Sequence, residues 1–311
     1  MLTPQNRFGR QFRAYLANRF TDVGVDGLGR PVHRVISLRF PSYAVRHPFH
    51  VCRLNHRLRE YYDLWPMLRA RLSRRGVLKE SLRRLLIHRL DAHLLKRRVK
   101  KVYAQSATIQ DRLRRWGRIP AEVLYPPPPH RAYRTESYEN TIFTVSRLTS
   151  LKRLDLLVEA FRHVRCRDTR AVIAGDGPER EPLTRRILEL GLEDRIRLLG
   201  PVDEETLLSH CGRCLAVYFC PKAEDCGFIT AEAFASRKAV ITAGDSGGPT
   251  ELVRDGESGF VVSPTPKEIA AKIDLLAETS GLAEKLGVRG YETVRRMTWP
   301  DTVRKLLLIS S

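Results

Sequence analysis

Two pairs of charged residues stand where a helical pattern begins after an apolar run. Arg147 and Lys152 follow the run that ends at Val145, and Glu224 and Glu232 enclose the start of a later helical pattern. Two cations aimed at one point suit a diphosphate, whose charge grows as it leaves a sugar. The two carboxylates are spaced to contact different parts of one ligand. Each segment alone is also typical of a solvated charged surface.

Gly227, Phe228 and Ile229 lie between the two carboxylates, in the expected first turn of that helix. Backbone amides in a first turn lack intrahelical partners, and the positive end of the helix favours an anion. The cationic segment is expected at the same edge of the sheet. The combination therefore predicts an anion site with carboxylates around it.

Alternating strands and helices are the elements that would position these residues. From residue 141 onward, short β-branched runs alternate with amphipathic helical patterns, which is typical of a parallel sheet with crossover helices. The predicted strands are Thr141–Val145, Ala171–Ala174, Ile196–Leu199, Ala216–Phe219, Ala239–Thr242 and Phe260–Val262. Ligands of such sheets bind beyond the carboxyl ends of the strands.

The first part of the chain is chemically different from the rest. Residues 1–134 contain 30 Lys and Arg against 8 Asp and Glu, whereas the remaining residues contain 25 against 27. Four proline residues end the run Tyr125–Pro129 and predict a connection between domains, because proline neither continues a helix nor pairs inside a sheet. The predicted strands before it are Val35–Leu38, Val51–Leu54, Val102–Ala104 and Val123–Tyr125.

Over residues 100–311 the sequence resembles the family-4 glycosyltransferases, which are retaining enzymes of the GT-B architecture with two Rossmann-like domains. The resemblance is carried by five segments in a fixed order. These are Val145–Asp155 (VSRLTSLKRLD), Ala174–Pro178 (AGDGP), Leu199–Val202 (LGPV), Glu224–Glu232 (EDCGFITAE) and Gly247–Glu251 (GGPTE).

The resemblance implies a role for each of the singled-out residues. Arg147 and Lys152 would hold the diphosphate of a nucleotide-sugar donor without a metal, with no other cofactor. Glu224 would contact hydroxyls of the transferred sugar, Glu232 would take the ribose hydroxyls, and Val202 would border the base. The donor would be GDP-mannose or a UDP-sugar, and a hexose would pass with retention to a hydroxyl of a glycan or lipid-linked acceptor.

The resemblance also implies an α/β fold with domain boundaries. We expect a basic acceptor-side domain over residues 1–128, a donor-binding domain over 129–298, and a helix over 299–311 that crosses back to the first domain. Family members usually begin with a strand and a glycine-rich turn, so we expect the first domain to be incomplete. His56 ends a predicted strand and is the candidate catalytic group facing the donor sugar, with the capping of a turn as the alternative.

Two further motifs suggest other chemistry but do not fit the fold. Gly244–Pro249 (GDSGGP) spells the nucleophile loop of trypsin-like proteases, which are all-β proteins, so Ser246 is not predicted to be a nucleophile. The cysteines from Cys211 to Cys226 lack the two close pairs of a zinc ribbon, so no metal site is predicted. Without a signal peptide, reduced thiols in a cytoplasmic protein are expected.

The net charge of +20 indicates an anionic partner. The stretch Arg69–Lys101 contains a predicted helix, 78–99, whose apolar side would hold Leu82, Leu85, Leu86, Leu90 and Leu94. It could bind lipid headgroups at the inner membrane surface, or it could be a solvated arginine-rich face. No apolar run is long enough to span a membrane. An inactive nucleotide-binding relative or a basic RNA-binding module is the alternative function.

Overall fold

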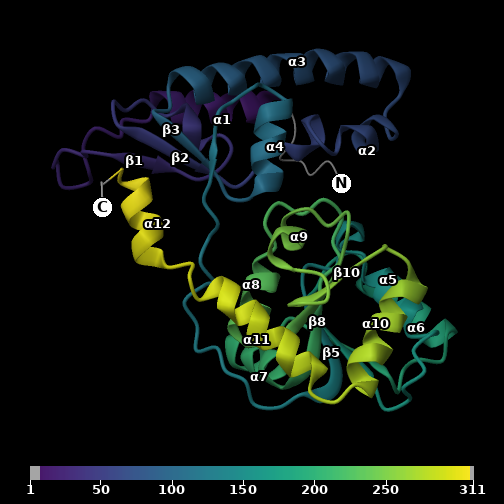
Figure 1. The fold of residues 1–311 in the computed structure, drawn as a ribbon. Helices are drawn as coiled ribbons and strands as arrows, with labels where there is room; N and C mark the ends of the chain where they lie inside the picture. Colours follow the sequence, from purple (N-terminus) through teal and green to yellow (C-terminus); the bar gives the residue numbers. More distant parts are fainter. Residues whose placement is uncertain (1–7, 309–311) are drawn as a thin grey trace. The chain divides into compact units, whose positions relative to one another are not determined.

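The computed structural model describes the backbone of residues 8–308 and the side chains of residues 11–308. The chain forms two compact units (Figure 1). Unit 1 contains the residues up to Tyr125 together with those from Trp299 onward, and unit 2 contains Pro126–Thr298. Each unit has an apolar core of its own.

Unit 2 is built on a six-stranded sheet in which every neighbouring pair of strands is parallel. The strand order is β10-β9-β8-β5-β6-β7. The strands are β5 (Glu139–Val145), β6 (Arg170–Ala174), β7 (Ile196–Gly200), β8 (Cys214–Tyr218), β9 (Ala239–Ala243) and β10 (Gly259–Val262). The neighbouring interior strands β8 and β9 are buried at every residue, as expected for a sheet covered on both faces. The predicted doubly wound α/β fold of this half is confirmed.

Helices cover both faces of this sheet (Figure 1). On one face α5 packs against α6 and α10, and on the other α11 packs against α8. The helices are α5 (Leu154–Ala160), α6 (Arg180–Glu189), α7 (Glu204–Arg213), α8 (Phe228–Ala235), α9 (Gly248–Leu252), α10 (Pro266–Glu278) and α11 (Leu282–Val294). Leu154, Leu157 and Val158 of α5 enter the core, as their spacing predicted.

Unit 1 contains a smaller parallel sheet with the order β1-β2-β3-β4. The strands are β1 (Val35–Ser37), β2 (His50–Leu54), β3 (Lys101–Ala104) and β4 (Glu122–Val123). The helices are α1 (Phe8–Phe20), α2 (Trp65–Arg69), α3 (Arg74–Arg97), α4 (Ala107–Arg115) and α12 (Trp299–Leu306). Within the described residues this sheet has four strands against six in unit 2, and both are Rossmann-like.

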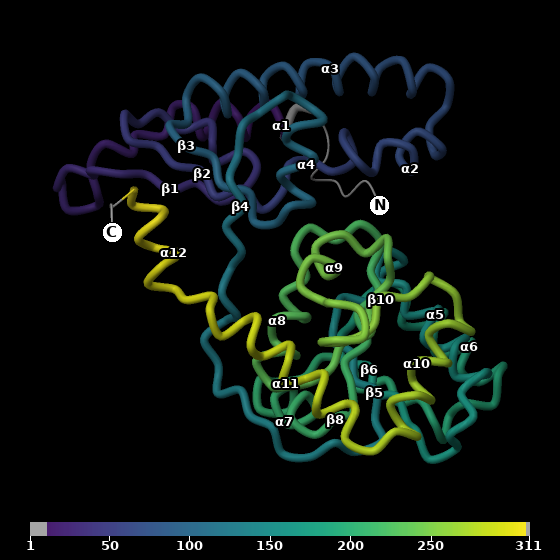
Figure 2. Tube along the Cα trace, in the orientation of Figure 1, coloured from purple at the N-terminus to yellow at the C-terminus, as the bar shows by residue number. Residues whose placement is uncertain are grey.

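The last helix belongs to unit 1 although unit 2 precedes it in the chain (Figure 2). Leu306 of α12 packs with Val51, Tyr103 and Leu124, and the Tyr103 hydroxyl donates a hydrogen bond to the carbonyl of Lys305 at 3.2 Å. The sequence predicted that this segment returns to the first domain. The predicted helix covered 299–311; α12 ends at Leu306, and positions 309–311 lie outside the described residues.

The predicted apolar side of α3 is divided between solvent and the core. Leu94 is buried, but Leu82, Leu85 and Leu86 are 60%, 48% and 55% exposed. The buried face instead carries Ile87, Asp91, Leu94 and Leu95. Leu82, Leu85 and Leu86 thus form an apolar face toward solvent, and Leu94 lies on the buried side of the same helix.

Candidate active site

The sheet of unit 2 has one topological switch point, between β5 and β8. From β5 the chain proceeds outward through β6 and β7, and it then returns to β8 on the other side of β5 before continuing to β9 and β10. The loops that leave the carboxyl ends of two such strands part in opposite directions, which leaves a crevice where ligands of open α/β sheets bind. The loops after β5 and β8 carry most of the predicted site residues.

Lys152 and Glu224 meet at this switch point. The Lys152 Nζ lies 2.7 Å from Glu224 Oε2, although the two residues are 72 positions apart in the chain. Their side chains are 16% and 24% exposed. Lys152 Nζ also lies 5.0 Å from the centre of the Phe219 ring. Because the Lys152 ammonium remains partly accessible, it can contact a bound anion either together with Glu224 or in place of Glu224.

Arg147 is exposed and lies at the start of the same loop as Lys152. Its carbonyl accepts a hydrogen bond from the amide of Thr149 at 2.9 Å, which fixes the loop just before the single 3₁₀ turn Ser150–Lys152. Within residues 8–308, no carboxylate forms an ion pair with the Arg147 guanidinium. This guanidinium is therefore available to an anionic ligand.

Arg153 ties together three loops of the site, a role that the sequence did not indicate. Its backbone is left-handed, with a φ of 50°, and this turns the chain from the 3₁₀ turn into α5. The guanidinium donates to the carbonyls of Cys220 and Pro221, both at 2.8 Å, and to both carboxylate oxygens of Asp245 at 2.6 and 2.9 Å. These contacts hold the loop after β5 against the loops after β8 and β9.

Two glycines allow the loops after β5 and β6 to approach each other closely. A Cβ atom on Gly175 would lie 1.9 Å from the carbonyl oxygen of Ser146, and one on Gly177 would lie 2.3 Å from that of Leu148. Both glycines have positive φ angles, 115° and 157°. The AGDGP motif therefore lets the backbone pack against Ser146 and Leu148, the two residues that flank Arg147.

A third glycine does the same for the loops after β8 and β9. Gly247 has a φ of 76°, and a Cβ atom there would lie 2.6 Å from the carbonyl oxygen of Glu224. The Glu224 amide donates to the Ser246 carbonyl at 2.7 Å, and its own carbonyl accepts from the Gly248 amide at 3.0 Å. Glu224 is thus fixed by its backbone on both sides.

Glu232 lies in α8 and pairs with an arginine that sequence reasoning missed. Arg131 donates to Glu232 Oε1 at 2.6 Å, across 101 residues of sequence. Burial raises the pKa of the Glu232 carboxyl above its ordinary value, and the charge of Arg131 opposes that shift. Arg131 is in the extended segment after the proline run, where no periodic pattern marks it as a site residue.

The first turn of α8 faces the same region. Gly227 precedes the helix with a left-handed backbone, φ 75°, and is buried, while the Phe228 side chain is 40% exposed. Among the described residues no backbone carbonyl accepts a hydrogen bond from the amides of Gly227, Phe228 or Ile229. Val202 is half-buried just after β7. The structure therefore leaves three donors available next to the Lys152–Glu224 pair.

His56, the candidate catalytic group of the first domain, lies in unit 1. It follows β2, its side chain is exposed, and its Nδ1 lies 3.1 Å from the carbonyl oxygen of Arg57. It lines a small cavity of about 20 Å³ together with Arg59, Asp63 and Arg112. The contact with the Arg57 carbonyl fits the capping alternative.

The burial of Ser246, Cys211 and Cys220 indicates that these residues have structural roles. Ser246 is fully buried, and its Oγ accepts a hydrogen bond from the Ala243 amide at 3.2 Å. Burial raises the pKa of the Cys211 thiol to about 11 and that of Cys220 to about 12, so both stay protonated.

One group of potential metal ligands occurs among the described residues, and it contains Cys166, Asp274 and Glu278. The Asp274 carboxylate already accepts hydrogen bonds from the amides of Arg165 and Cys166 at 3.0 and 3.1 Å. None of these three residues belongs to the predicted donor site.

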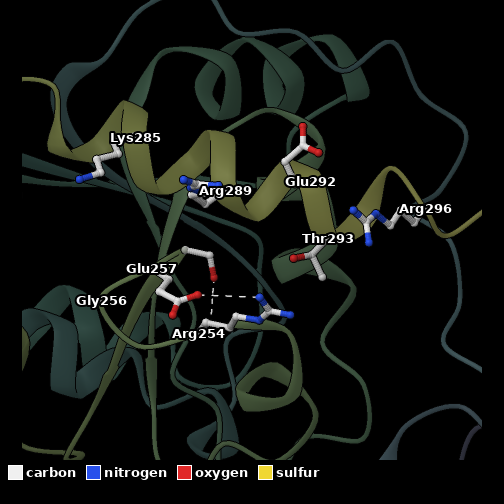
Figure 3. Close-up of a pocket in the computed structure, with 9 residues that line it drawn as sticks. Arg254, Gly256, Glu257, Lys285, Arg289, Glu292, Thr293 and Arg296 are labelled. Atoms are coloured by element: carbon white, nitrogen blue, oxygen red, sulfur yellow. Dashed lines mark hydrogen bonds and ion pairs between the residues drawn. The ribbon is translucent and has the colours of Figure 1, made fainter.

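A larger cavity of about 730 Å³ lies beside α11. Lys285, Arg289 and Arg296 come from α11 and the turn after it, and Arg254 comes from the loop before β10 (Figure 3). Glu257 lies 3.8 Å from Arg254. None of the predicted donor-binding residues lines this cavity, so it is separate from the candidate active site.

Comparison with known families identifies this arrangement. The model of the family described as glycosyl transferases group 1 matches residues 130–293, which is just over half of the chain. The chain belongs to this family. The match covers the whole set of loops around Arg147, Lys152, Glu224 and Glu232, and it confirms the resemblance to family-4 glycosyltransferases that the motifs indicated.

Curated relatives of this group 1 glycosyl transferase match over about half of its chain. It is 32% identical over 149 residues to the alpha-D-kanosaminyltransferase of Streptomyces kanamyceticus, covering 47% of this chain and 38% of the relative. It is 33% identical over 188 residues to the GDP-mannose-dependent alpha-(1-6)-phosphatidylinositol monomannoside mannosyltransferase of Mycolicibacterium smegmatis, covering 55% of this chain and 48% of the relative. The chain thus spans less than half the length of both.

Solved structures extend the similarity across both units of this group 1 glycosyl transferase. The sucrose-phosphate synthase of Thermosynechococcus elongatus matches with a TM-score of 0.71 and 19% identity, covering 96% of this chain and 77% of that one. Anabaena HepE in complex with UDP matches with a TM-score of 0.68 and 21% identity, covering 83% and 70%. The likeness shows that the fold is GT-B.

Proposed function

We propose that this chain transfers a hexose from a nucleotide-sugar donor to an acceptor hydroxyl with retention of configuration. The observation that carries the proposal is the contact between Lys152 and Glu224 at the switch point of the unit 2 sheet. Here a cation for the diphosphate and a carboxylate for the sugar stand side by side, next to the unpaired amides that begin α8. In a nucleotide sugar the diphosphate and the transferred sugar are likewise directly bonded neighbours.

In the proposed reaction the protein supplies charge and position. Arg147, Lys152 and the first amides of α8 stabilise the negative charge that develops on the departing nucleoside diphosphate. Glu224 orients the sugar through its hydroxyls, and Glu232 accepts hydrogen bonds from the ribose. The acceptor hydroxyl attacks from the face that the leaving group quits, so no side chain becomes a covalent nucleophile. His56 would face the donor sugar from unit 1.

The nucleotide and the acceptor are proposed by class. The matched HepE structures are complexes with UDP or UDP-glucose, and one relative is GDP-mannose-dependent, so UDP-sugars and GDP-mannose are the first donors to test. A glycan or lipid-linked hydroxyl is the proposed acceptor, since one relative is named for a phosphatidylinositol mannoside. We place the reaction on the cytoplasmic side, at the inner membrane surface.

Exchange of Lys152 for alanine tests the donor site. We expect Lys152→Ala to weaken binding of the nucleotide sugar by about 1.5–3 kcal/mol, the usual contribution of a hydrogen bond to a charged group. The measurement is calorimetric titration of the full chain with a panel of UDP-sugars and GDP-mannose. Lys267→Ala removes an exposed cation of α10 and is the matched control. Equal affinity of the Lys152 variant and the wild type would refute the assigned role.

Metal removal tests the charge balance of the same site. Because two cationic side chains and helix amides face the diphosphate, we expect donor binding and transfer to proceed without a divalent ion. Both are measured with excess EDTA and again with added Mg²⁺ or Mn²⁺. A loss of donor affinity in EDTA that a metal restores would contradict this part of the proposal.

A further inference from the structure

The solvent-facing side of α3 combines leucines with cations. Four leucines are 48–69% exposed there: Leu78, Leu82, Leu85 and Leu86. Because a helix turns 100° per residue, these positions share one face. The other exposed side chains of the helix are Ser81, His93 and six cations: Arg74, Arg75, Lys79, Arg89, Lys96 and Arg97.

No carboxylate is exposed on this described helix. Its two acidic residues are Glu80, 13% exposed and paired with Arg83 at 2.8 Å, and the buried Asp91. Asp91 accepts hydrogen bonds from the hydroxyls of Tyr15, Tyr43 and Tyr62 inside the unit. A merely solvated helix face commonly alternates cations with carboxylates and lacks exposed leucines, because i,i+4 pairs of opposite charge stabilise it.

An apolar pocket adjoins the leucines. It has a volume of about 400 Å³, and Phe12 and Tyr15 of α1 line it with Leu86, Ile87 and Leu90 of α3. Arg89 is also among its lining residues. The Phe12 side chain is 50% exposed, so the apolar surface continues from α3 onto α1. We call Phe12, Leu78, Leu82, Leu85 and Leu86 the leucine face.

We propose that the leucine face docks on an anionic lipid bilayer. The leucines would insert among the acyl chains, the pocket between α1 and α3 would receive part of one chain, and the flanking cations, such as Arg75 and Arg89, would contact headgroup phosphates. Aliphatic side chains that project between cations suit a surface whose hydrocarbon lies just beneath its charge. The two carboxylates of this described helix, Glu80 and Asp91, are largely covered, so α3 itself presents cations and leucines to the phosphates.

An RNA backbone would also attract these cations, but it offers nothing to the leucines. Single-stranded nucleic acid is held by stacking of successive bases on aromatic side chains beside the charge, whereas the leucine face has four leucines and a single aromatic side chain, Phe12. The lipid surface is therefore the partner that explains both the charges and the apolar side chains. Within the described residues no helix is long and apolar enough to cross a membrane.

Vesicle binding by the full chain tests the proposal. We expect co-sedimentation with mixed phosphatidylcholine–phosphatidylglycerol vesicles and little binding to phosphatidylcholine alone. Leu82→Ser combined with Leu86→Ser should lower the partition coefficient at least about tenfold. Leu188→Ser is the control, because Leu188 is 57% exposed on α6 of unit 2. Since all three leucines are exposed, circular dichroism should show that both variants fold.

The cations are tested separately. Arg75→Gln combined with Arg89→Gln should weaken vesicle binding about 25-fold at low salt, at about fivefold per cation near an anionic surface. Arg185→Gln with Lys267→Gln removes two exposed cations of unit 2 and should change binding far less. Binding to RNA that is tighter than binding to vesicles, and that the two serine changes leave unaltered, would overturn the lipid assignment.

Insertion is read directly from fluorescence. A tryptophan placed as Leu82→Trp should shift its emission to shorter wavelength with anionic vesicles and be quenched by brominated acyl chains, whereas Leu188→Trp should show neither effect. Absence of quenching, or no vesicle binding by the wild type at low salt, would overturn the inference. Donor binding does not enter these measurements, so the result is independent of the proposed transfer reaction.

Discussion

At the scale of single residues, the candidate site depends on charges that already have protein partners. Lys152 holds Glu224, and Arg131 holds Glu232. In each pair the cation offsets the negative charge of a carboxylate that would otherwise repel the anionic donor. The donor must therefore compete with, or join, existing contacts, and its affinity should depend on the ionisation of the buried partner.

Glu232 gives a pH prediction. Burial raises the pKa of its carboxyl, so the protonated form persists to a higher pH than in an ordinary glutamate. Only the ionised carboxylate offers all of its oxygens as acceptors to ribose hydroxyls. We expect donor affinity to fall as the pH is lowered through this raised pKa, and calorimetry across a pH series measures it. Glu232→Gln should bind more weakly at neutral pH and lose this pH dependence; an unchanged profile would contradict the role.

At the scale of elements, the site depends on how closely the loops beyond the strands pack. Arg153 bonds to the loops after β8 and β9, and Gly175 lets the loop after β6 lie against Ser146. The functional side chains are thus held by backbone contacts between loops that are remote in sequence. A single added methyl group at such a contact should displace the cations of the site.

Gly175→Ala tests this dependence. The new Cβ would meet the Ser146 carbonyl oxygen at 1.9 Å and would require a φ of 115°. We expect the free energy of unfolding to fall by about 2–4 kcal/mol and donor affinity to fall with it. Gly191→Ala is the control, since Gly191 has a φ of 61° with open space around it. Its cost should be about 1 kcal/mol, with donor affinity unchanged. Equal effects of the two changes would show that the contact with Ser146 is unimportant.

At the scale of the whole molecule, one chain forms two units with separate cores, and its end returns to the first of them. α12 packs Leu306 against Val51, Tyr103 and Leu124, all of unit 1. Unit 1 therefore includes residues from both ends of the described chain. Its stability should depend on the last helix, whereas that of unit 2 should not.

Leu306→Ala tests this division. Leu306 is 7% exposed, and its truncation should lower the free energy of unfolding of unit 1 by about 2–3 kcal/mol. Differential scanning calorimetry should show a shift in one transition while that of unit 2 stays in place. Val303→Ala changes a residue of the same helix that is 45% exposed and should shift neither transition. Equal shifts of both transitions would mean that the units do not unfold separately.

Much of the fold could be predicted because local patterns specify it. Buried parallel strands appear as short β-branched runs, and all ten predicted runs form strands, with bounds that differ by one or two residues. The ends of these strands then place Arg147, Lys152, Glu224 and Glu232 at one sheet edge. Helical spacing predicted that Leu82, Leu85 and Leu86 share a face, but spacing does not show whether such a face meets a core or solvent, and in the structure it meets solvent.

The sequence by itself determined the alternation of strands and helices and the kinds of charged group that follow the strands, since both are local properties of the chain. Only the tertiary structure decided which groups meet: Lys152 with Glu224, Arg131 with Glu232, and Arg153 with Asp245. These partners are 72 to 101 residues apart, and no spacing along the chain encodes their contact. For Lys152 with Glu224 and Arg153 with Asp245, the order of strands in the sheet brings the partners together, because it places the ends of β5, β8 and β9 side by side.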